Sequence, residues 1–405
     1  WLEAKIGGLT REQREFLLSE DADDFAGSHK KLLQRLEAKS PAEIAAYVDG
    51  MMSVARAQKF NPATDMAAIP LNTEASKFNL WKLRRPESFS PRREPGPITL
   101  NYYASGRAAI RTFANAPVAI YPEDLVAGKV DVAIVGAPLD MGSYYRGQRF
   151  GPMAMRNEYG AGGIDMNTMV NPSKELNIVD YGDIAIDNMS TERTVHHVRE
   201  RVAEIARTGA LPFIVGGDHS LAIGSISAAA KHCRNTGRKL RVLWFDAHAD
   251  FNTNVLTPSG NVHGMPVACL CGHGPPELVS IGGQVPAIDP AQLRQIGIRS
   301  VDAGEKRFVH EVGIEVFDMR YIDEMGMRHT LEQALLGVDE DTHIHVSLDV
   351  DFLDPDIAPG VGTTVSGGPT YREAQLCMEM VADTGQLASL DIVELNPAFD
   401  IRNRT

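Results

Sequence analysis

Hydrophobic and polar positions follow three different patterns along the 405 residues of the chain. In residues 11–58, apolar side chains such as Leu32 and Leu36 recur at helical spacing among charged ones, which predicts helices. Residues 60–97 are rich in Pro, Arg, Ser and Asn, and this composition predicts an extended, irregular connector. From Val130 onwards, short aliphatic and β-branched runs alternate with helical patterns, which predicts strands separated by helices.

The alternation beyond Val130 predicts an α/β fold in which helices cover both faces of a parallel sheet. The predicted strands are 130–135, 212–215, 241–245, 315–317, 343–350 and 389–395. The predicted helices include 191–207, 221–232, 331–335 and 371–382. We therefore expect a helical and extended N-terminal arm over residues 1–129 and an α/β domain over residues 130–405. Ligands of such sheets gather at the carboxyl ends of the strands.

The composition is that of an ordinary globular protein with an acidic surface. The chain carries 53 acidic and 40 basic residues, a formal net charge of −13, which disfavours nucleic acid as a partner because phosphates would be repelled. No apolar run approaches the roughly 20 residues that span a bilayer, so we expect no membrane partner. The four cysteines form no CxxC pair and no signal peptide is visible, so we expect buried thiols and a cytoplasmic location.

Acidic and imidazole side chains stand directly after three of the predicted strands. The segments are GGDHS at 216–220, DAHAD at 246–250 and SLDVD at 347–351. Spacing by two residues places alternate side chains on one face of an extended chain, and the paired glycines of the first segment allow a tight turn. The side chains that we expect to meet at the strand ends are His219, Asp246, His248, Asp250, Asp349 and Asp351.

A cluster of four carboxylates and two imidazoles predicts a metal centre. The carboxylates would repel one another in a partly buried crevice, and two divalent ions would balance their charge. Mixed oxygen and nitrogen ligands suit Mn²⁺, Fe²⁺, Co²⁺, Ni²⁺ or Zn²⁺ rather than Ca²⁺. One such motif alone usually marks a solvated loop or a helix cap, whereas three after three strands favour a metal site. Asp218 faces away from His219 and is expected to orient a ligand or to begin the next helix.

The three segments resemble the signatures of the ureohydrolase family, which includes arginase, agmatinase, guanidinobutyrase, guanidine hydrolase and formiminoglutamase. The resemblance extends from about Val130 to Thr405. It implies a three-layer α/β/α fold with a central parallel sheet, a binuclear metal centre, and hydrolysis of a guanidino group to urea and an amine or ammonia. It also implies a homo-oligomer, a trimer or a hexamer.

The resemblance assigns ligands to both metal ions. One ion would bind His219, Asp246, Asp250 and Asp349, and the other would bind Asp246, His248, Asp349 and Asp351. Asp246 and Asp349 would therefore bridge the two ions. Mn²⁺ is the usual metal of arginases and is the expected one, while the likeness to guanidine hydrolases keeps Ni²⁺ as the alternative.

Three catalytic roles follow from the same resemblance. Asp250 would accept a proton from the attacking water and pass it to the leaving amine. Glu394, at the end of the strand 389–395, would pair with the planar guanidinium. His263 would exchange protons with bulk water, which an imidazole does well near neutral pH. From the residues alone, Glu394 could equally be a surface salt-bridge partner and His263 a loop residue.

The loop at 250–266 and the segment 299–305 resemble the arginase subgroup, so L-arginine is the expected substrate. The implied contacts are Asn252, Ser259 and Asn261 for its α-carboxylate, Asp302 and Glu305 for its α-amino group, and Thr363 for its guanidinium. Amide and hydroxyl donors suit a carboxylate, and an acid suits an ammonium. Small cationic molecules also agree with the acidic surface.

Three features depart from the arginase pattern. Residues 144–152 look more like agmatinases and guanidine hydrolases. Phe352 stands where arginases usually carry glycine, and it either narrows the pocket or packs in the core. The N-terminal extension is similar to those of guanidine hydrolases, and its segment 98–103 is a candidate lid or a docking segment. Guanidine, agmatine, guanidinobutyrate and alkylguanidines are therefore alternative substrates.

A non-catalytic family member acting as a subunit is an alternative of another class. Such a chain would have lost metal ligands, His263 or Glu394, and all of these are present here. Hydrolysis of a formimino group is a further alternative, which would need a pocket without the contacts of Ser259 and Asp302. The sequence therefore favours an active metal-dependent ureohydrolase.

Overall fold

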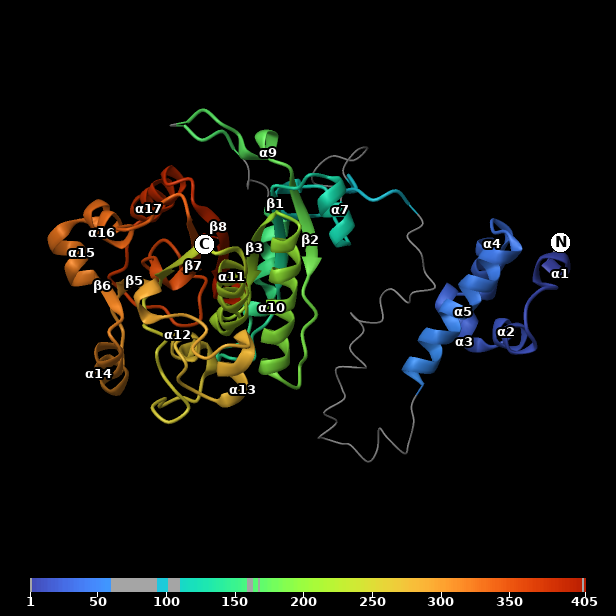
Figure 1. Cartoon of the computed structure of the whole chain (residues 1–405), viewed down its shortest axis with the longest axis horizontal. Coiled ribbons are helices and arrows are strands. Elements are labelled where there is room, and N and C mark those ends of the chain that lie inside the picture. Colours follow the sequence, from blue (N-terminus) through green and yellow to red (C-terminus); the bar gives the residue numbers. More distant parts are fainter. Residues whose placement is uncertain (1, 60–92, 101–109, 159–162, 167, 403) are drawn as a thin grey trace. The chain divides into compact units, whose positions relative to one another are not determined.

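The computed structural model describes residues 2–59, 93–100, 110–158, 163–166, 168–402 and 404–405 (Figure 1). The chain forms two compact units, Trp1–Glu94 and Pro95–Thr405. Residues 95–129, which the sequence pattern assigns to the N-terminal arm, cluster with the second unit. Most of the predicted connector 60–97 and residues 101–103 of the candidate lid lie outside the described residues.

The first unit is helical, as the spacing of its apolar residues predicts. Its helices are α1 (Leu2–Ile6), α2 (Arg11–Leu17), α3 (Glu20–Ala26), α4 (His29–Glu37) and α5 (Pro41–Gln58). Capping residues divide the predicted helical stretch into these short pieces: Gly27, with φ 82°, ends α3, and the side chain of Ser40 accepts a hydrogen bond from Glu43 N at the start of α5. Leu32 and Ile44 are buried in a small core of this unit.

The second unit is built on a single sheet of parallel strands. The strands are β1 (Val132–Ala137), β2 (Ile178–Asp183), β3 (Leu211–Gly216), β4 (Lys239–Phe245), β5 (Leu293–Ile298), β6 (Glu315–Asp318), β7 (Thr342–Asp349) and β8 (Leu387–Val393). Their order is β2-β1-β3-β8-β7-β4-β5-β6, and every pairing is parallel. The central strands β3, β8, β7 and β4 therefore end side by side, where ligands of such sheets bind.

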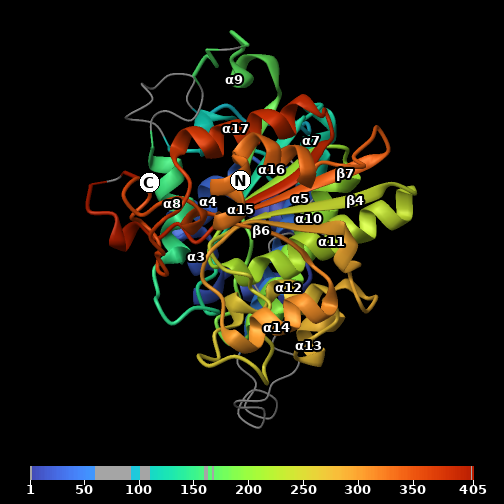
Figure 2. The ribbon, with the colours of Figure 1, turned by 90° about the vertical axis from the view of Figure 1, so that its left-hand side faces the viewer.

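Helices lie on both sides of the sheet, which gives the expected α/β/α arrangement (Figure 2). The helices are α7 (Pro122–Ala127), α8 (Gly151–Asn157), α9 (Pro172–Glu175), α10 (Thr191–Arg207), α11 (Ala222–Thr236), α12 (Pro266–Leu270), α13 (Pro276–Val279), α14 (Ala303–Val312), α15 (Met319–Met325), α16 (Met327–Ala334) and α17 (Tyr371–Asp383). No helix among the described residues is both long and apolar enough to cross a membrane.

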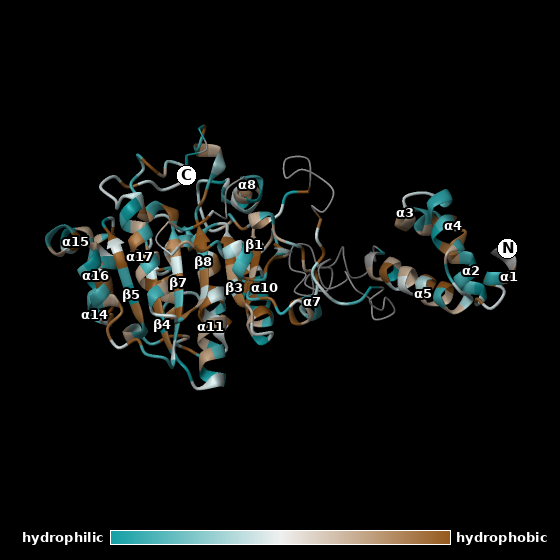
Figure 3. Cartoon of the chain, turned by 90° about the horizontal axis from the view of Figure 1, so that it is seen from above, coloured by the Kyte–Doolittle hydropathy of each residue, from teal (hydrophilic) through white to brown (hydrophobic). Residues whose placement is uncertain are grey.

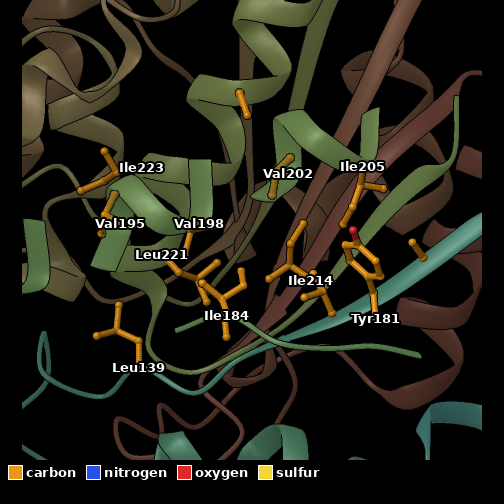
Figure 4. Close-up of a cluster of buried hydrophobic side chains, with 14 of the residues drawn as sticks. Leu139, Tyr181, Ile184, Val195, Val198, Val202, Ile205, Ile214, Leu221 and Ile223 are labelled. Atoms are coloured by element: carbon orange, nitrogen blue, oxygen red, sulfur yellow. The ribbon is translucent and has the colours of Figure 1, made fainter. Parts of the chain in front are cut away.

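Alternate side chains of each strand build the cores of the two faces. On β4, Trp244 packs in one core with residues of α11, whereas Phe245 packs in another with residues of α16 and α17. Figure 4 shows a third core, in which Val198 and Ile205 of α10 pack near Ile214 of β3. Each such fully buried side chain contributes about 1.5–3 kcal/mol to folding. Figure 3 shows hydrophobic residues concentrated around β3 and β8 in the middle of the sheet.

The predicted strands and helices are present, but two strands were missed. Strand β2 begins with only two aliphatic residues, Ile178 and Val179, and continues with Asp180 and a polar end. The apolar run of β5 is interrupted by Arg294 and Gln295. Neither segment forms the continuous apolar run that predicts a buried parallel strand. The helix predicted at 191–207 matches α10 at both ends, because Ser190 caps its start and its apolar face is strongly periodic.

Candidate active site

The carboxyl ends of the four central strands bring the predicted cluster together. His219 begins the short 3₁₀ turn His219–Leu221 after β3, and Asp246 follows β4 directly. Asp349 is the last residue of β7, Asp351 stands two positions later, and Glu394 follows β8. Since β7 pairs with both β4 and β8, these ends are neighbours in space.

A glycine and an aspartate shape the turn that carries His219. Gly217 has φ +58°, and a Cβ there would lie 2.3 Å from the carbonyl oxygen of Ala137, so only glycine fits. Asp218 accepts hydrogen bonds from Ser220 N at 3.0 Å and from Gly142 N at 2.7 Å. It therefore caps the turn and fixes the neighbouring loop, as expected of a charge that begins a helix.

The carboxylates crowd around two imidazole nitrogens. Nδ1 of His219 lies 3.1 Å from Asp246 Oδ2, 3.4 Å from Asp250 Oδ2 and 3.2 Å from Asp349 Oδ2. The second imidazole, His248, places Nδ1 3.0 Å from Asp351 Oδ2 and 3.5 Å from Asp246 Oδ1. The donor atoms of His219, Asp246 and Asp250 form one group within 4.8 Å of one another, and those of Asp246, His248 and Asp351 form a second. Asp246 belongs to both groups.

The electrostatics of this cluster fit a pair of divalent cations. Burial and the neighbouring charge of Asp246 raise the pKa of Asp250 well above its usual value, and burial with the charge of Asp351 does the same for Asp349. Burial alone would lower the pKa of His248, but Asp351 and Asp246 raise it to about 12. So many buried acids demand compensating positive charge, and oxygen and nitrogen donors of this kind suit first-row divalent ions.

A cavity of about 190 Å³ opens beside the cluster. It is lined by His248, Asp250, Asp349 and His263 together with all six predicted substrate contacts, Asn252, Ser259, Asn261, Asp302, Glu305 and Thr363. Thr257 and Ser300 also line it and were not singled out from the sequence. Hydroxyl, amide and carboxylate groups thus surround one small space next to the buried acids.

Hydrogen bonds fix the two loops that form this cavity. Asn252 donates from Nδ2 to Asp302 Oδ2 at 3.1 Å, while its Oδ1 is buried without a partner among the described residues. Glu305 accepts from Phe251 N at 2.8 Å and from Asp302 N at 3.1 Å. The start of α14 is therefore tied to the loop after β4. Thr363 donates to Asp351 Oδ2 at 3.1 Å.

Glu394 contacts His263 and is fully buried. Its Oε1 is 2.9 Å from His263 Nδ1 and accepts a hydrogen bond from His219 N at 2.8 Å. Burial opposes its ionisation, but the charge of His263 and these hydrogen bonds lower the pKa of Glu394. Burial opposes the protonation of His263, yet Glu394 raises its pKa. The surface salt-bridge interpretation of Glu394 is therefore wrong.

Two of these acids stand in strained backbone. Asp250 has φ 49° and Glu394 has φ 66°, in the left-handed region that residues other than glycine rarely adopt. Such conformations persist where the surrounding structure holds them, and they gather at functional sites. Phe352, in contrast, is fully buried and packs against Phe245 with 5.3 Å between ring centroids, so the core-packing interpretation of this residue is favoured.

A buried polar ladder supports His219 and was not recognised from the sequence. Ser347 lies 2.8 Å by its Oγ from His219 Nε2, and it donates to Asp391 Oδ1 at 2.5 Å. Asp391 Oδ2 is also 3.0 Å from His345 Nε2, and it accepts from Ser225 Oγ at 2.6 Å. The signal was present: on β7, residues 343, 345, 347 and 349 are polar at alternate positions, so one face of a buried strand is polar throughout.

Comparison with known proteins identifies the family of the α/β unit. A profile of the arginase family matches residues 130–405. The arginase of Bacillus caldovelox is 41% identical over 290 residues, which cover 68% of this chain and 93% of that relative. The chain belongs to the arginase family. Members of this family are metal-dependent hydrolases that act on guanidino groups, and this chain is an enzyme of that class with a binuclear divalent metal centre.

Solved structures of the arginase family share the fold. The crystal structure of arginase from Bacillus subtilis has a TM-score of 0.62 and 38% identity, covering 68% of this chain and 94% of that one. Proclavaminate amidino hydrolase from Streptomyces clavuligerus has a TM-score of 0.59 and 27% identity, covering 78% of this chain and 94% of that one. The expected three-layer fold is therefore confirmed.

Proposed function

We propose that this arginase-family hydrolase cleaves the guanidino group of L-arginine to give urea and L-ornithine. The observation that carries the proposal is a single cavity in which the buried acids meet Asn252, Ser259 and Asp302. Neutral donors and an acid that line one space of about 190 Å³ suit the α-carboxylate and α-ammonium of an amino acid. We assign Thr363 and His263, which also line this cavity, to the guanidinium.

The proposed metal ligands are His219, Asp246, Asp250 and Asp349 for one ion and Asp246, His248, Asp349 and Asp351 for the other. When bound, two divalent ions lower the pKa of water so that it becomes a nucleophile near neutral pH. We propose Mn²⁺ as the resident metal, with Ni²⁺ as the alternative. Oxygen-rich ligands suit Mn²⁺, although affinity alone does not select it.

The chain itself would bind, orient and move protons. Asp302, held by Asn252, would bind the ammonium of the substrate. This contact would select substrates by the distance between their ammonium and guanidinium groups. Glu394 would pair with the guanidinium, since a low pKa keeps its carboxylate charged. Asp250 would take the proton of the attacking water and deliver it to the leaving nitrogen. His263, which lines the cavity and contacts Glu394, would exchange protons with solvent.

Urea release from a substrate panel tests this proposal. The purified full chain, loaded with Mn²⁺ or Ni²⁺, would be assayed with L-arginine, agmatine, 4-guanidinobutyrate, guanidine and methylguanidine. We expect the highest kcat/KM for L-arginine, and more activity with Mn²⁺ than with Ni²⁺. A higher kcat/KM for any other member of the panel would overturn the arginine assignment, while no urea from the whole panel would overturn the reaction.

A guanidino compound without the amino-acid end is the second candidate. The structural match to proclavaminate amidino hydrolase covers 78% of this chain, against 68% for Bacillus subtilis arginase, so it takes in residues outside the arginase match. The segment 144–152 supports the same branch, with guanidine, agmatine, guanidinobutyrate or an alkylguanidine as substrate. Guanidine and alkylguanidines have neither a carboxylate nor an ammonium for Ser259 and Asp302 to bind.

We further propose a homo-oligomer, a trimer or a hexamer, in the cytoplasm. The four cysteines, Cys233, Cys269, Cys271 and Cys377, are free and buried, which supports a reducing compartment. Light scattering coupled to size-exclusion chromatography would measure the mass of the assembly. A monomeric mass at micromolar concentration would contradict the oligomer.

A further inference from the structure

Gln148 makes a contact with Glu394 that the proposed mechanism does not use. It begins the 3₁₀ turn Gln148–Phe150 and is fully buried. Its Nε2 donates to Glu394 Oε2 at 2.9 Å. The other carboxylate oxygen of Glu394, Oε1, faces His263 Nδ1 and accepts from His219 N. Gln148 therefore holds the oxygen of Glu394 that neither histidine contacts.

The amide oxygen of Gln148 is a buried acceptor without a hydrogen-bond partner among the described residues. Buried polar atoms are nearly always paired, so an orphan beside a candidate site points to a missing partner. This oxygen belongs to the same amide as Nε2, which donates to the Glu394 carboxylate. A neutral acceptor on an amide that is hydrogen-bonded to a charged acceptor suits a planar cation with several N–H groups.

The loop that carries Gln148 is held tightly against the end of β8. Asp140 accepts from Gly147 N at 3.0 Å and from Arg149 Nη2 at 2.5 Å. Gly147 has φ +131°, and a Cβ there would lie 2.3 Å from Asn396 Oδ1. Asn396 in turn donates to the carbonyl oxygen of Arg146 at 3.2 Å. The side chain of Gln148 is thus placed by contacts on both sides of it.

We infer that Gln148 is the positioning residue for Glu394 and a specificity determinant for the guanidinium group. Its Nε2 fixes the plane of the carboxylate, and its Oε1 accepts an N–H of the substrate guanidinium. This inference rests on the proposed function, in which Glu394 pairs with the guanidinium. Gln148 lies in the segment 144–152, which departs from the arginase pattern, and the inference gives this segment a role in the site.

Gln148→Met tests the inference, because methionine has a similar length and shape but cannot replace the amide. The metal-loaded full chain would be assayed with L-arginine, using guanidinium and L-ornithine as competitive inhibitors. Loss of a hydrogen bond to a charged group weakens binding by about 10- to 100-fold. We expect the inhibition constant of guanidinium to rise, and kcat for L-arginine to fall, by about that factor. The inhibition constant of L-ornithine, which lacks a guanidinium, should change less than about twofold.

Gln284→Met, at an exposed position, is the matched control and should behave as the wild type. If Gln148 has only a structural role, the variant should bind both L-ornithine and guanidinium more weakly, and that result would overturn the inference. Inhibition constants equal to those of the wild type would also overturn it. If thermal melting shows that Gln148→Met is unfolded, Gln148→Leu provides the same comparison. Failure of the proposed function is distinguishable, because the wild type would then release no urea from L-arginine.

Discussion

The imidazole ring of His219 lies flat on the indole ring of Trp244, with 3.9 Å between ring centroids and 5° between the ring planes. The same indole donates from Nε1 to Asp246 Oδ2 at 3.0 Å. One fully buried side chain of β4 therefore orients two of the proposed metal ligands. Groups that orient ligands in this way commonly change metal affinity by tenfold or more.

Trp244→Phe should weaken metal binding, because phenylalanine keeps the aromatic packing but cannot donate to Asp246. We expect the apparent dissociation constant for Mn²⁺ to rise by about 10-fold, with the fold retained. Titration against a fluorescent chelator would measure it, and circular dichroism would report the fold. Tyr371→Phe, on the exposed side of α17, is the control. An unchanged Mn²⁺ affinity in Trp244→Phe would show that the indole does not orient a ligand.

Asp250→Asn should abolish turnover while leaving the fold intact. The amide preserves the shape of the side chain but cannot accept a proton from water, and general-base catalysis is typically worth 10²–10⁴-fold. We expect kcat to fall by at least about 10²-fold, measured by urea release at saturating Mn²⁺. Metal content after dialysis, measured by elemental analysis, separates loss of the base from loss of the metal. Full activity of this variant would refute the role given to Asp250.

The strand-end motifs were sufficient to predict the fold and the meeting of the six proposed ligands. Each motif stands at the end of a predicted strand, and the carboxyl ends of parallel strands share one edge of the sheet. His219 could thus be placed near Asp246 and Asp349, although they are far apart in the sequence. Strand β5 escaped prediction because Arg294 and Gln295 interrupt its apolar run.

The contacts that support the site were harder to predict, because they depend on register between strands that are distant in sequence. Ser347 and Asp391 meet only because β7 and β8 pair with these residues opposite each other. Gln148 reaches Glu394 across 246 positions, from a loop whose course nothing in the local sequence specifies. Alternating polar residues on β7 indicated a polar face, but not which residues would receive its hydrogen bonds.

Ser259→Ala and Asp302→Ala should raise KM for L-arginine. Both residues line the cavity, and the proposed contacts are with the charged ends of the amino acid, where a hydrogen bond is worth about 1.5–3 kcal/mol. We expect a rise in KM of about 10-fold or more for L-arginine, and little change for guanidine, which has neither group. Steady-state urea release with both substrates would measure this. Unchanged arginine kinetics would contradict the arginase-like interpretation of the loop 250–266.

Asp140→Asn should destabilise the chain at neutral pH and matter less in acid. Burial opposes ionisation of Asp140, but Arg149 and Gly147 N lower the pKa of its carboxyl below the ordinary 3.8. The ionised pair therefore contributes its full stability above pH 3.8, and that stability is lost as the pH falls through the lower pKa of the folded state. Because Arg149 is partly exposed, we expect a loss of about 1–2 kcal/mol at pH 7.

Urea denaturation of wild type and Asp140→Asn at pH 7 and pH 3 would test this pH dependence. The difference in free energy of unfolding between the two proteins should shrink at the lower pH. Asp323→Asn, at an exposed position of α15, serves as the control and should change stability little at either pH. A difference that stays constant or grows on acidification would contradict the proposed role of the ionised pair.

Deletion of residues 1–94 should alter either kcat/KM or the mass of the assembly. These residues form a compact unit of their own, with buried Leu32 and Ile44 in its core, and every proposed metal ligand lies in the other unit. The remaining chain should therefore keep its melting transition and its Mn²⁺ affinity. If the N-terminal extension covers the site, kcat/KM should change by several-fold; if it joins subunits, light scattering should report a smaller assembly. Unchanged activity and mass together would contradict both roles.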